Sequence, residues 1–185
     1  MTKPLKKDAT YADLCALPEN FVAEILGGEL YASPRPAFAH AHAFGALFRK
    51  LGRHFQDGDD GPGGWWFLCE PELHFGADVL VPDIAGWRRE RMPAIPNVAY
   101  FTLAPDWLCE VLSPSTESID RRKKLPIYAR EGVAHAWLVD PLQQTLEVLR
   151  LESQRWSMVA DHEGSAKVRA EPFEAIELTL RALWL

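Results

Sequence analysis

The run WLCEVLS, at residues 107–113, constrains the fold most strongly because nearly all of its residues are apolar. A strand that is apolar on both faces is typical of the centre of a sheet that is covered on both sides. The segment STESIDRRKKLPIYAREG follows and is predicted to be a helix closed by Gly132, and the apolar run HAWLVD comes next. This order predicts a crossover, with a helix at 115–131 joining strands at 107–113 and 134–139. The chain is therefore expected to form a mixed α/β sheet.

Shorter patterns predict the elements on either side of this crossover. Thr10 suits the N-cap of a short helix in YADLCAL, and Gly27-Gly28 separates two β-prone runs that suit a hairpin. Apolar residues at helical spacing predict a longer helix over 37–55, and the composition of 57–64 predicts a loop. Further strands are predicted at WWFLCE, ELHF and VLVPDIAGW, at TLEVLRL, and in a terminal meander at RWSMVAD and KVRA.

Composition and charge narrow the class of protein. The length of 185 residues, with 48% hydrophobic and 25% charged residues, fits a single domain over residues 1–185. No apolar run approaches the roughly 20 residues of a membrane helix, and no apolar segment follows the N-terminal lysines as in a secretory signal. Three widely spaced cysteines without a CxxC motif predict reduced thiols in a cytoplasmic protein. The net charge of −6 argues against broad electrostatic binding to nucleic acid, and on charge alone the basic clusters at 87–91 and 120–124 are interpreted as solvated surfaces.

Two acidic residues interrupt the predicted apolar strands. Asp83 lies within VLVPDIAGW, and Glu110 lies within WLCEVLS, where strand periodicity places it on the same face as Leu108 and Leu112. An ionised carboxylate in an apolar interior is costly unless it is paired, protonated or bound to a metal. Each carboxylate could be satisfied separately by backbone groups or arginine, or the pair could hold Mg²⁺ or Mn²⁺, which prefer hard oxygen ligands. A buried pair of carboxylates also suits a glycosidase or a metal-dependent hydrolase of small phosphoesters.

Four segments resemble one known family, in order and at compatible spacing: AEILGGELYASPRP, VLVPDIAGW, WLCEVLSPST and DRRKKLPIYAREGVAHAWLVDP. From about Tyr11 to Leu151 the chain is similar to the Uma-type restriction endonucleases, long catalogued as a domain of unknown function and assigned to the PD-(D/E)XK nuclease superfamily. The resemblance implies a restriction-endonuclease-like fold, in which helices flank a mixed central β-sheet and the chain begins with a helix and a β-hairpin. It also implies a Mg²⁺- or Mn²⁺-dependent endonuclease that hydrolyses DNA phosphodiester bonds.

The same resemblance implies roles for individual residues. Asp83 and Glu110 match the two acidic residues that bind the metal, with the carbonyl of Val111 as a third protein ligand. Glu24 matches an early glutamate that completes the acidic cluster. His40 matches a histidine of the family, and it would hydrogen-bond a phosphate or an acidic ligand.

The lysine of the superfamily pattern is displaced in this chain. The pattern has a lysine two residues after the second acidic residue, where this chain has Leu112. The resemblance places the lysine on the crossover helix at Lys124, with Lys123 as its rival. It would orient or activate the attacking water and stabilise the pentavalent phosphate. Pro126 follows closely, so either the helix kinks there or its regular part begins there.

Basic residues of the same helix and the expected partners complete the prediction. If DNA binds, Arg121, Arg122 and Lys123 would contact phosphates; otherwise they form an exposed helix end. The expected partners are DNA and, by analogy with such folds, a second copy of the chain in a homodimer, with no membrane and no organic cofactor. Two alternatives remain open: a catalytically weak or inactive nuclease-fold protein that serves in binding or assembly, and a hydrolase of small phosphoesters.

Overall fold

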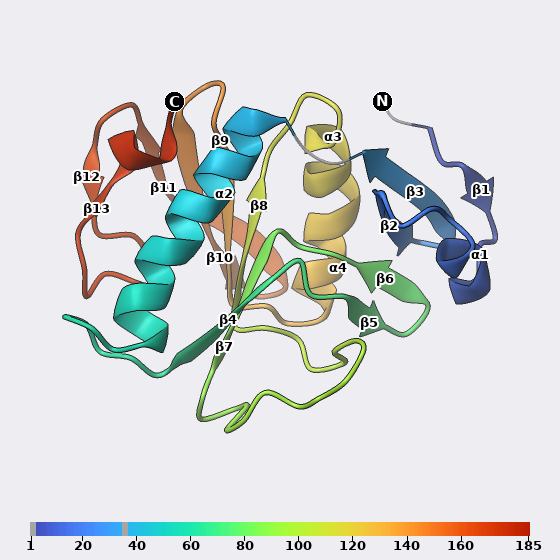
Figure 1. The fold of residues 1–185 in the computed structure, drawn as a ribbon, viewed down its shortest axis with the longest axis horizontal. Helices are drawn as coiled ribbons and strands as arrows, with labels where there is room; N and C mark the ends of the chain where they lie inside the picture. The colour runs from blue at the N-terminus through green and yellow to red at the C-terminus, as the bar shows by residue number, and fades with distance from the viewer. Residues whose placement is uncertain (1–2, 35–36) are drawn as a thin grey trace.

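A six-stranded mixed sheet lies at the centre of the molecule, in a computed structural model that describes residues 3–34 and 37–185 (Figure 1). Arg35 and Pro36, which end the segment AEILGGELYASPRP, lie outside the described residues. The strand order is β11-β10-β9-β8-β7-β4, in which β8 and β9 run parallel and the other neighbours run antiparallel. The strands are β4 (Trp65–Cys69), β7 (Ile84–Arg88), β8 (Trp107–Val111), β9 (His135–Asp140), β10 (Thr145–Glu152) and β11 (Arg155–Glu163).

The predicted crossover joins β8 to β9 through a helix with three parts. These parts are α3 (Glu117–Ile119), the π-helical turn η2 (Asp120–Lys124) and α4 (Leu125–Arg130). Pro126 lies in the first turn of α4, where the missing N–H of proline is tolerated. Two outcomes were predicted for Pro126, a kink or the start of the regular helix. The structure shows the second: a regular α-helix begins at Leu125, directly after the wider π-helical turn η2. The parallel pairing of β8 with β9 confirms the crossover.

A second sheet of five short strands contains the N-terminal part of the chain, in the order β1-β3-β2-β6-β5. Gly27 and Gly28 form the turn of the predicted hairpin, with φ of +61° and +78°, which glycine adopts at little cost. Thr10 precedes α1 as predicted, and its N–H donates to the carboxylate of Asp13 at 2.8 Å. The elements are β1 (Lys6–Lys7), α1 (Tyr11–Cys15), β2 (Phe21–Leu26), β3 (Glu29–Pro34), β5 (Leu73–Phe75) and β6 (Asp78–Leu80).

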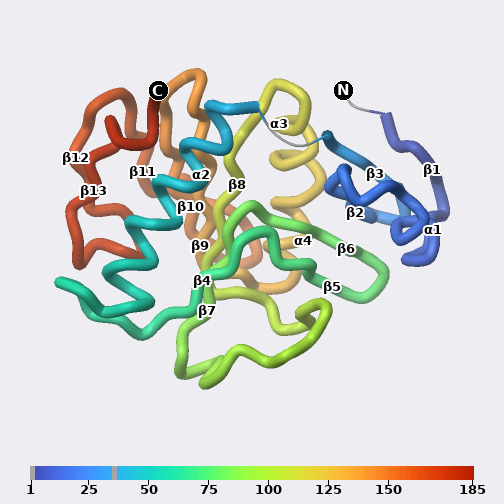
Figure 2. The backbone as a smooth tube through the Cα atoms, viewed as in Figure 1, coloured from blue at the N-terminus to red at the C-terminus, as the bar shows by residue number. Residues whose placement is uncertain are grey.

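Both faces of the six-stranded sheet are covered. One face packs against α2 (Phe38–Leu51), its π-helical extension η1 (Gly52–Gln56) and the C-terminal segment. Figure 2 shows this segment beside α2; in it β12 (Lys167–Val168) pairs with β13 (Leu178–Thr179) before the 3₁₀ turn η3 (Leu180–Leu183). The crossover helix and the five-stranded sheet cover the other face. Every residue of β8 is buried, as a central strand requires. No helix in the described ranges is long and apolar enough to span a membrane.

Two predicted strands differ in the structure. The run VLVPDIAGW does not form one strand, because β6 ends at Leu80, β7 begins at Ile84, and the two belong to different sheets. Pro82 lies between them, and proline has no N–H with which to continue a strand ladder. The terminal meander ends with β11, because the KVRA segment pairs with β13 in a separate two-stranded sheet.

Candidate active site

Asp83 lies where the chain passes from the five-stranded sheet into the six-stranded sheet. It is therefore not inside a strand, as predicted, but immediately precedes β7. Its Oδ2 accepts a hydrogen bond from the N–H of Val111 at 2.7 Å. Its carbonyl accepts another from the N–H of Glu70 at 2.9 Å. These bonds hold the carboxylate beside the C-terminal end of β8.

The carboxylate of Glu110 is buried beneath the crossover helix, and only 2% of the residue is exposed. Its neighbours Leu108 and Leu112 pack in the core on this side of the sheet, as strand periodicity predicts. Tyr128 donates its hydroxyl to Oε1 of Glu110 at 2.7 Å. The ammonium of Lys124 lies 2.9 Å from the same oxygen. The helix therefore orients this carboxylate through two donors.

Lys124 is a buried cation that joins two elements of the site. The residue is 3% exposed, and its Nζ lies 2.9 Å from Oε1 of Glu24 as well as 2.9 Å from Oε1 of Glu110. Lys123 instead pairs with Glu29 at 3.1 Å, and 43% of its side chain is exposed. The structure therefore brings Lys124, and not Lys123, to Glu24 and Glu110.

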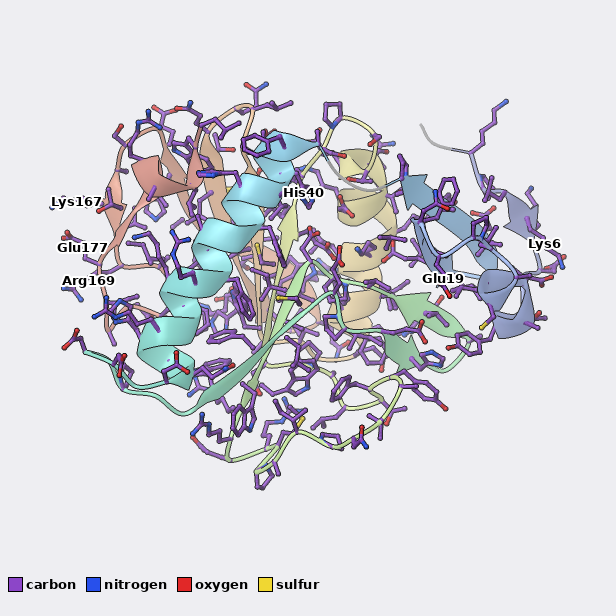
Figure 3. All side chains as sticks on the ribbon, in the orientation of Figure 1. Lys6, Glu19, His40, Lys167, Arg169 and Glu177 are labelled. Carbon is purple, nitrogen blue, oxygen red and sulfur yellow. The ribbon has the colours of Figure 1, made fainter. Side chains whose placement is uncertain are left out.

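Glu24 and His40 border the same place from β2 and α2. Oε1 of Glu24 accepts the N–H of Val81 at 2.8 Å, and the carbonyl of Val81 accepts a hydrogen bond from Lys124 Nζ at 3.1 Å. His40 lies near the N-terminal end of α2 (Figure 3), and its Nε2 is 3.3 Å from Oδ1 of Asp83. Its Nδ1 is buried and has no hydrogen-bond partner among the described residues. We call the following group the acidic site: Glu24, His40, Asp83, Glu110, Asp120 and Lys124.

Acidic groups outnumber basic groups in the acidic site, with four carboxylates against one lysine and one histidine. Burial and the neighbouring carboxylates raise the pKa of Glu110 well above its usual value, although the charge of Lys124 opposes this shift. Burial and the neighbouring carboxylates also raise the pKa of Asp120 to about 7, again against the charge of Lys124. Bound protons or an added cation would relieve this surplus of negative charge.

The two basic groups are favoured in their protonated forms. Burial acts to lower the pKa of Lys124, but the charges of Glu110 and Glu24 more than offset it and raise that pKa well above its usual value. Burial also acts to lower the pKa of His40, and the hydrogen bond and charge of Asp83 raise it above the ordinary value. Lys124 is therefore an ammonium at neutral pH. In this form it can donate hydrogen bonds and stabilise negative charge.

The donor set of the acidic site fits a hard divalent cation. A cavity of about 360 Å³ is lined by Asp83, Glu110 and Val111, which offer two carboxylates and a backbone carbonyl. Across residues 3–34 and 37–185, no three His, Cys, Asp or Glu side chains are arranged as a metal-ligand set. Mg²⁺ commonly uses only one or two carboxylates and completes its shell with waters and phosphates. Glu24 also lines this cavity, and its contacts with the N–H of Val81 and with Lys124 both use Oε1, so its Oε2 remains available to a cation.

The three residues predicted to contact phosphates differ in their surroundings. Arg121 donates from Nη1 to Glu147 on β10 at 2.8 Å. Lys123 is paired with Glu29 on β3, whereas Arg122 is exposed. Two of the three are thus already engaged by carboxylates within the chain.

Three residues in or next to the acidic site were not assigned a role in it from the sequence. Asp120 lies four residues before Lys124 with its Oδ1 3.7 Å from the ammonium, and Tyr128 lies four residues after it. This helical spacing was a usable signal, because residues four apart share one helix face. Glu70 lines the cavity from a left-handed backbone conformation, with φ of +45°. In the sequence, Glu70 and Glu72 flank Pro71 and could line a cleft, but no pattern assigns them a role there.

Comparisons with known proteins relate the chain to nucleases. Residues 8–181 match the family described as "Uma2: Putative restriction endonuclease". The fold resembles the crystal structure of "a putative nuclease belonging to DUF820" from Anabaena variabilis ATCC 29413, with 24% sequence identity and a TM-score of 0.75 over 95% of this chain and 97% of that chain. At this identity the likeness concerns the fold, and it confirms the predicted nuclease-like α/β architecture. No match was found among curated proteins.

Proposed function

The chain belongs to the Uma2 family, described as "Putative restriction endonuclease", and on this premise we propose that it is a metal-dependent endonuclease that hydrolyses phosphodiester bonds of DNA. The proposed cofactor is Mg²⁺ or Mn²⁺, and the proposed working form is a homodimer. The nuclease-like fold agrees with the family but does not by itself carry an activity.

The meeting of Asp83, Glu110 and Lys124 in one cavity supports this proposal most. Glu110 and Lys124 are buried there and Asp83 is partly buried, although burying charged groups is costly for stability. Strongly perturbed pKa values of the kind found for Glu110 cluster at functional sites. The residues come from the start of β7, from β8 and from the crossover helix, so the fold must be complete before the site exists.

Each residue has a role that its geometry supports. A divalent cation held by Asp83, Glu110 and Val111 would supply charge neutralisation and an activated water. The ammonium of Lys124 would stabilise the negative charge that develops on the phosphate. Glu24 holds that ammonium in place at 2.9 Å. His40, in its protonated form, would donate a hydrogen bond to a phosphate oxygen.

Nicking of supercoiled plasmid in Mg²⁺ or Mn²⁺ tests the proposal. The variant Glu110→Gln keeps the size of the side chain but removes its charge, and we expect it to slow nicking by about 100-fold or more. The matched control is Glu177→Gln, in which an exposed glutamate far from the acidic site carries the same change. The control is expected to nick like the wild type, and EDTA is expected to stop both. Sedimentation equilibrium of the wild type tests the homodimer.

The remaining outcomes distinguish the alternatives. Equal nicking by the wild type and Glu110→Gln, or no nicking by any form, would overturn the proposal. DNA binding without cleavage would favour a binding or assembly protein that keeps the fold. Hydrolysis of bis(p-nitrophenyl) phosphate without plasmid cleavage would favour a hydrolase of small phosphoesters.

A further inference from the structure

A second cavity of about 600 Å³ opens beside the acidic site. We call it the side cavity. It lies between the segment that leads from α1 into β2 and the first turns of α2. The side cavity and the acidic-site cavity have five lining residues in common: Val22, His40, Glu70, Val81 and Asp83. The side cavity is therefore adjacent to the acidic site, and the same side chains border both.

The walls of the side cavity are unsuited to a phosphate. Three acidic side chains line it in addition to Asp83, namely Glu19, Glu70 and Glu72, and among the described residues the only basic side chain in its lining is His40, which also borders the acidic site. The apolar part includes the aromatic rings of Phe21 and Phe44. Phosphate groups are bound by cationic side chains and N–H donors, whereas bases stack on aromatic and apolar surfaces. The lining therefore favours a flat, uncharged group with hydrogen-bond donors.

Glu72 is held as a fixed acceptor in this lining. Its Oε1 accepts the hydroxyl of Tyr11 at 2.8 Å and lies 2.7 Å from Nε2 of His74. His74 in turn stacks on Tyr100, with ring centroids 3.8 Å apart. These contacts orient the carboxylate, and they engage only one of its two oxygens. The other oxygen can accept hydrogen bonds from a ligand.

Glu70 lines both cavities. Its backbone is left-handed at φ +45°, and its N–H is bonded to the carbonyl of Asp83 at 2.9 Å. A non-glycine residue held in this region costs free energy, and such residues cluster at functional sites. The border that the two cavities share is therefore formed in part by a constrained segment that carries a carboxylate.

From these observations we infer that the side cavity binds one nucleobase of the substrate, while the phosphate attached to that nucleotide lies in the acidic site. The inference rests on the proposed nuclease function and names its substrate class. A base inside a duplex is stacked and paired, so it must leave the helix to enter such a cavity. The substrate is therefore DNA with an unpaired nucleotide, as in a single strand, a bulge or a mismatch. Because the acceptors are carboxylates, guanine is preferred over thymine, since N1–H and the N2 amino group of guanine are adjacent donors.

Binding of three small probes tests the inference without any need for cleavage. The probes are dGMP, dTMP and deoxyribose 5-phosphate, titrated calorimetrically into the protein with Ca²⁺ present. The wild type is expected to bind dGMP about tenfold more tightly than deoxyribose 5-phosphate, and more tightly than dTMP. Equal affinities for all three probes would overturn the inference.

Two alanine-to-phenylalanine variants form a matched pair. Ala41 is an exposed residue of α2 that lines only the side cavity, so Ala41→Phe fills that space. Ala12 is an exposed residue of α1 that lines neither cavity. Ala41→Phe is expected to abolish the advantage of dGMP over deoxyribose 5-phosphate, whereas Ala12→Phe is expected to keep it. Loss of the advantage in both variants, or in neither, would contradict the inference.

A third variant keeps the test decisive if Ala41→Phe does not fold. Glu72→Gln removes an acceptor that lines only the side cavity, and it is expected to reduce the preference for dGMP over dTMP about threefold or more. In a parallel assay, an oligonucleotide with one unpaired guanine is expected to be cut faster than the matched duplex. Base-dependent binding without cleavage would leave the side cavity established and refute the nuclease. Plasmid nicking without base-dependent binding would support the nuclease and refute the binding of a base in the side cavity.

Discussion

Lys124 sets the charge balance of the acidic site at the level of single residues. Its ammonium contacts Glu24 and Glu110, and all three side chains are largely buried. Removing one partner of a buried ion pair leaves an uncompensated charge in the low-dielectric interior of the protein. Lys124→Met keeps the aliphatic stem, and we expect it to lower the free energy of unfolding by about 3–5 kcal/mol at pH 8. Urea denaturation measures this loss.

Lys123→Met is the matched control for this prediction. Lys123 forms an exposed pair with Glu29 at 3.1 Å, and such pairs contribute little to stability. Its unfolding curve is expected to overlap that of the wild type. Similar losses in both variants would show that Lys124 is not the buried counter-charge.

Asp120 makes stability depend on pH in a defined direction. Burial and neighbouring carboxylates raise its pKa from 3.8 to about 7 in the folded protein. Between these values the folded state keeps a proton that the unfolded state has released. The free energy of unfolding therefore falls as the pH rises from about 4 to about 7, since folding is favoured where its bound proton is retained. The stabilising contribution is complete below pH 4 and is lost above pH 7.

Asp120→Asn removes this titration. Relative to the wild type, the variant is expected to gain stability steadily as the pH rises from 4 to 8, by up to about 4 kcal/mol, in the presence of EDTA. Urea unfolding at several pH values measures the difference between the two proteins. A difference that does not change with pH would mean that Asp120 titrates normally in the folded state.

The unusual acidic residues could be recognised from the sequence, but not all of their partners could. Asp83 and Glu110 could be recognised because a carboxylate in an apolar run is expensive. Glu70 could be considered as a residue that lines a cleft but could not be assigned to the site, since its place in the cavity depends on a left-handed backbone and on a bond to the Asp83 carbonyl. When a tertiary contact determines where a residue lies, the local sequence pattern does not predict its position.

At the level of elements, periodicity predicted most of the secondary structure. The apolar run at 107–113 became the buried strand β8, and the helix after it became the crossover. The break at Pro82 was missed, because apolar residues on both sides of it suggested one strand. The π-helical turn η2 was also missed, although Pro126 marked the place where the helix had to change. When a proline interrupts an apolar or helical pattern, local propensity does not predict whether the element ends, kinks or changes its helical type.

Gly86 tests the packing of β7 between its neighbours. A Cβ at this position would lie 3.0 Å from the ring of Phe67 and 3.2 Å from that of Trp107, both of which are buried. Gly86→Ala is therefore expected to lower the free energy of unfolding by about 1–3 kcal/mol, because the crowded core must shift. Gly45→Ala, in α2, is the matched change where a Cβ meets no atom within 4 Å. It is expected to raise the free energy of unfolding by about 1 kcal/mol, since alanine favours helix. A lower free energy of unfolding for Gly86→Ala together with a higher one for Gly45→Ala, both measured by urea denaturation, would confirm both predictions. A lower free energy of unfolding for Gly45→Ala would contradict the open environment of that residue.

For the molecule as a whole, charge limits how the proposed DNA substrate can be bound. The net charge is −6, and Arg121 and Lys123 are already paired with carboxylates of neighbouring strands. A protein that neutralises many phosphates needs a broad basic surface. This chain is therefore expected to hold DNA mainly through the acidic site, a divalent cation and the base in the side cavity.

The salt dependence of DNA binding measures this balance directly. Each phosphate neutralised adds about −0.7 to the slope of log K against log salt for a single strand. We expect a slope no steeper than about −2 with Ca²⁺ present, measured by fluorescence anisotropy of a labelled single-stranded oligonucleotide. Arg122→Ala is expected to flatten the slope, because Arg122 is exposed, whereas Arg121→Ala is expected to change it less, because Glu147 already balances that charge. A slope near −6 would show many phosphate contacts, and binding would then require a basic surface formed between copies of the chain.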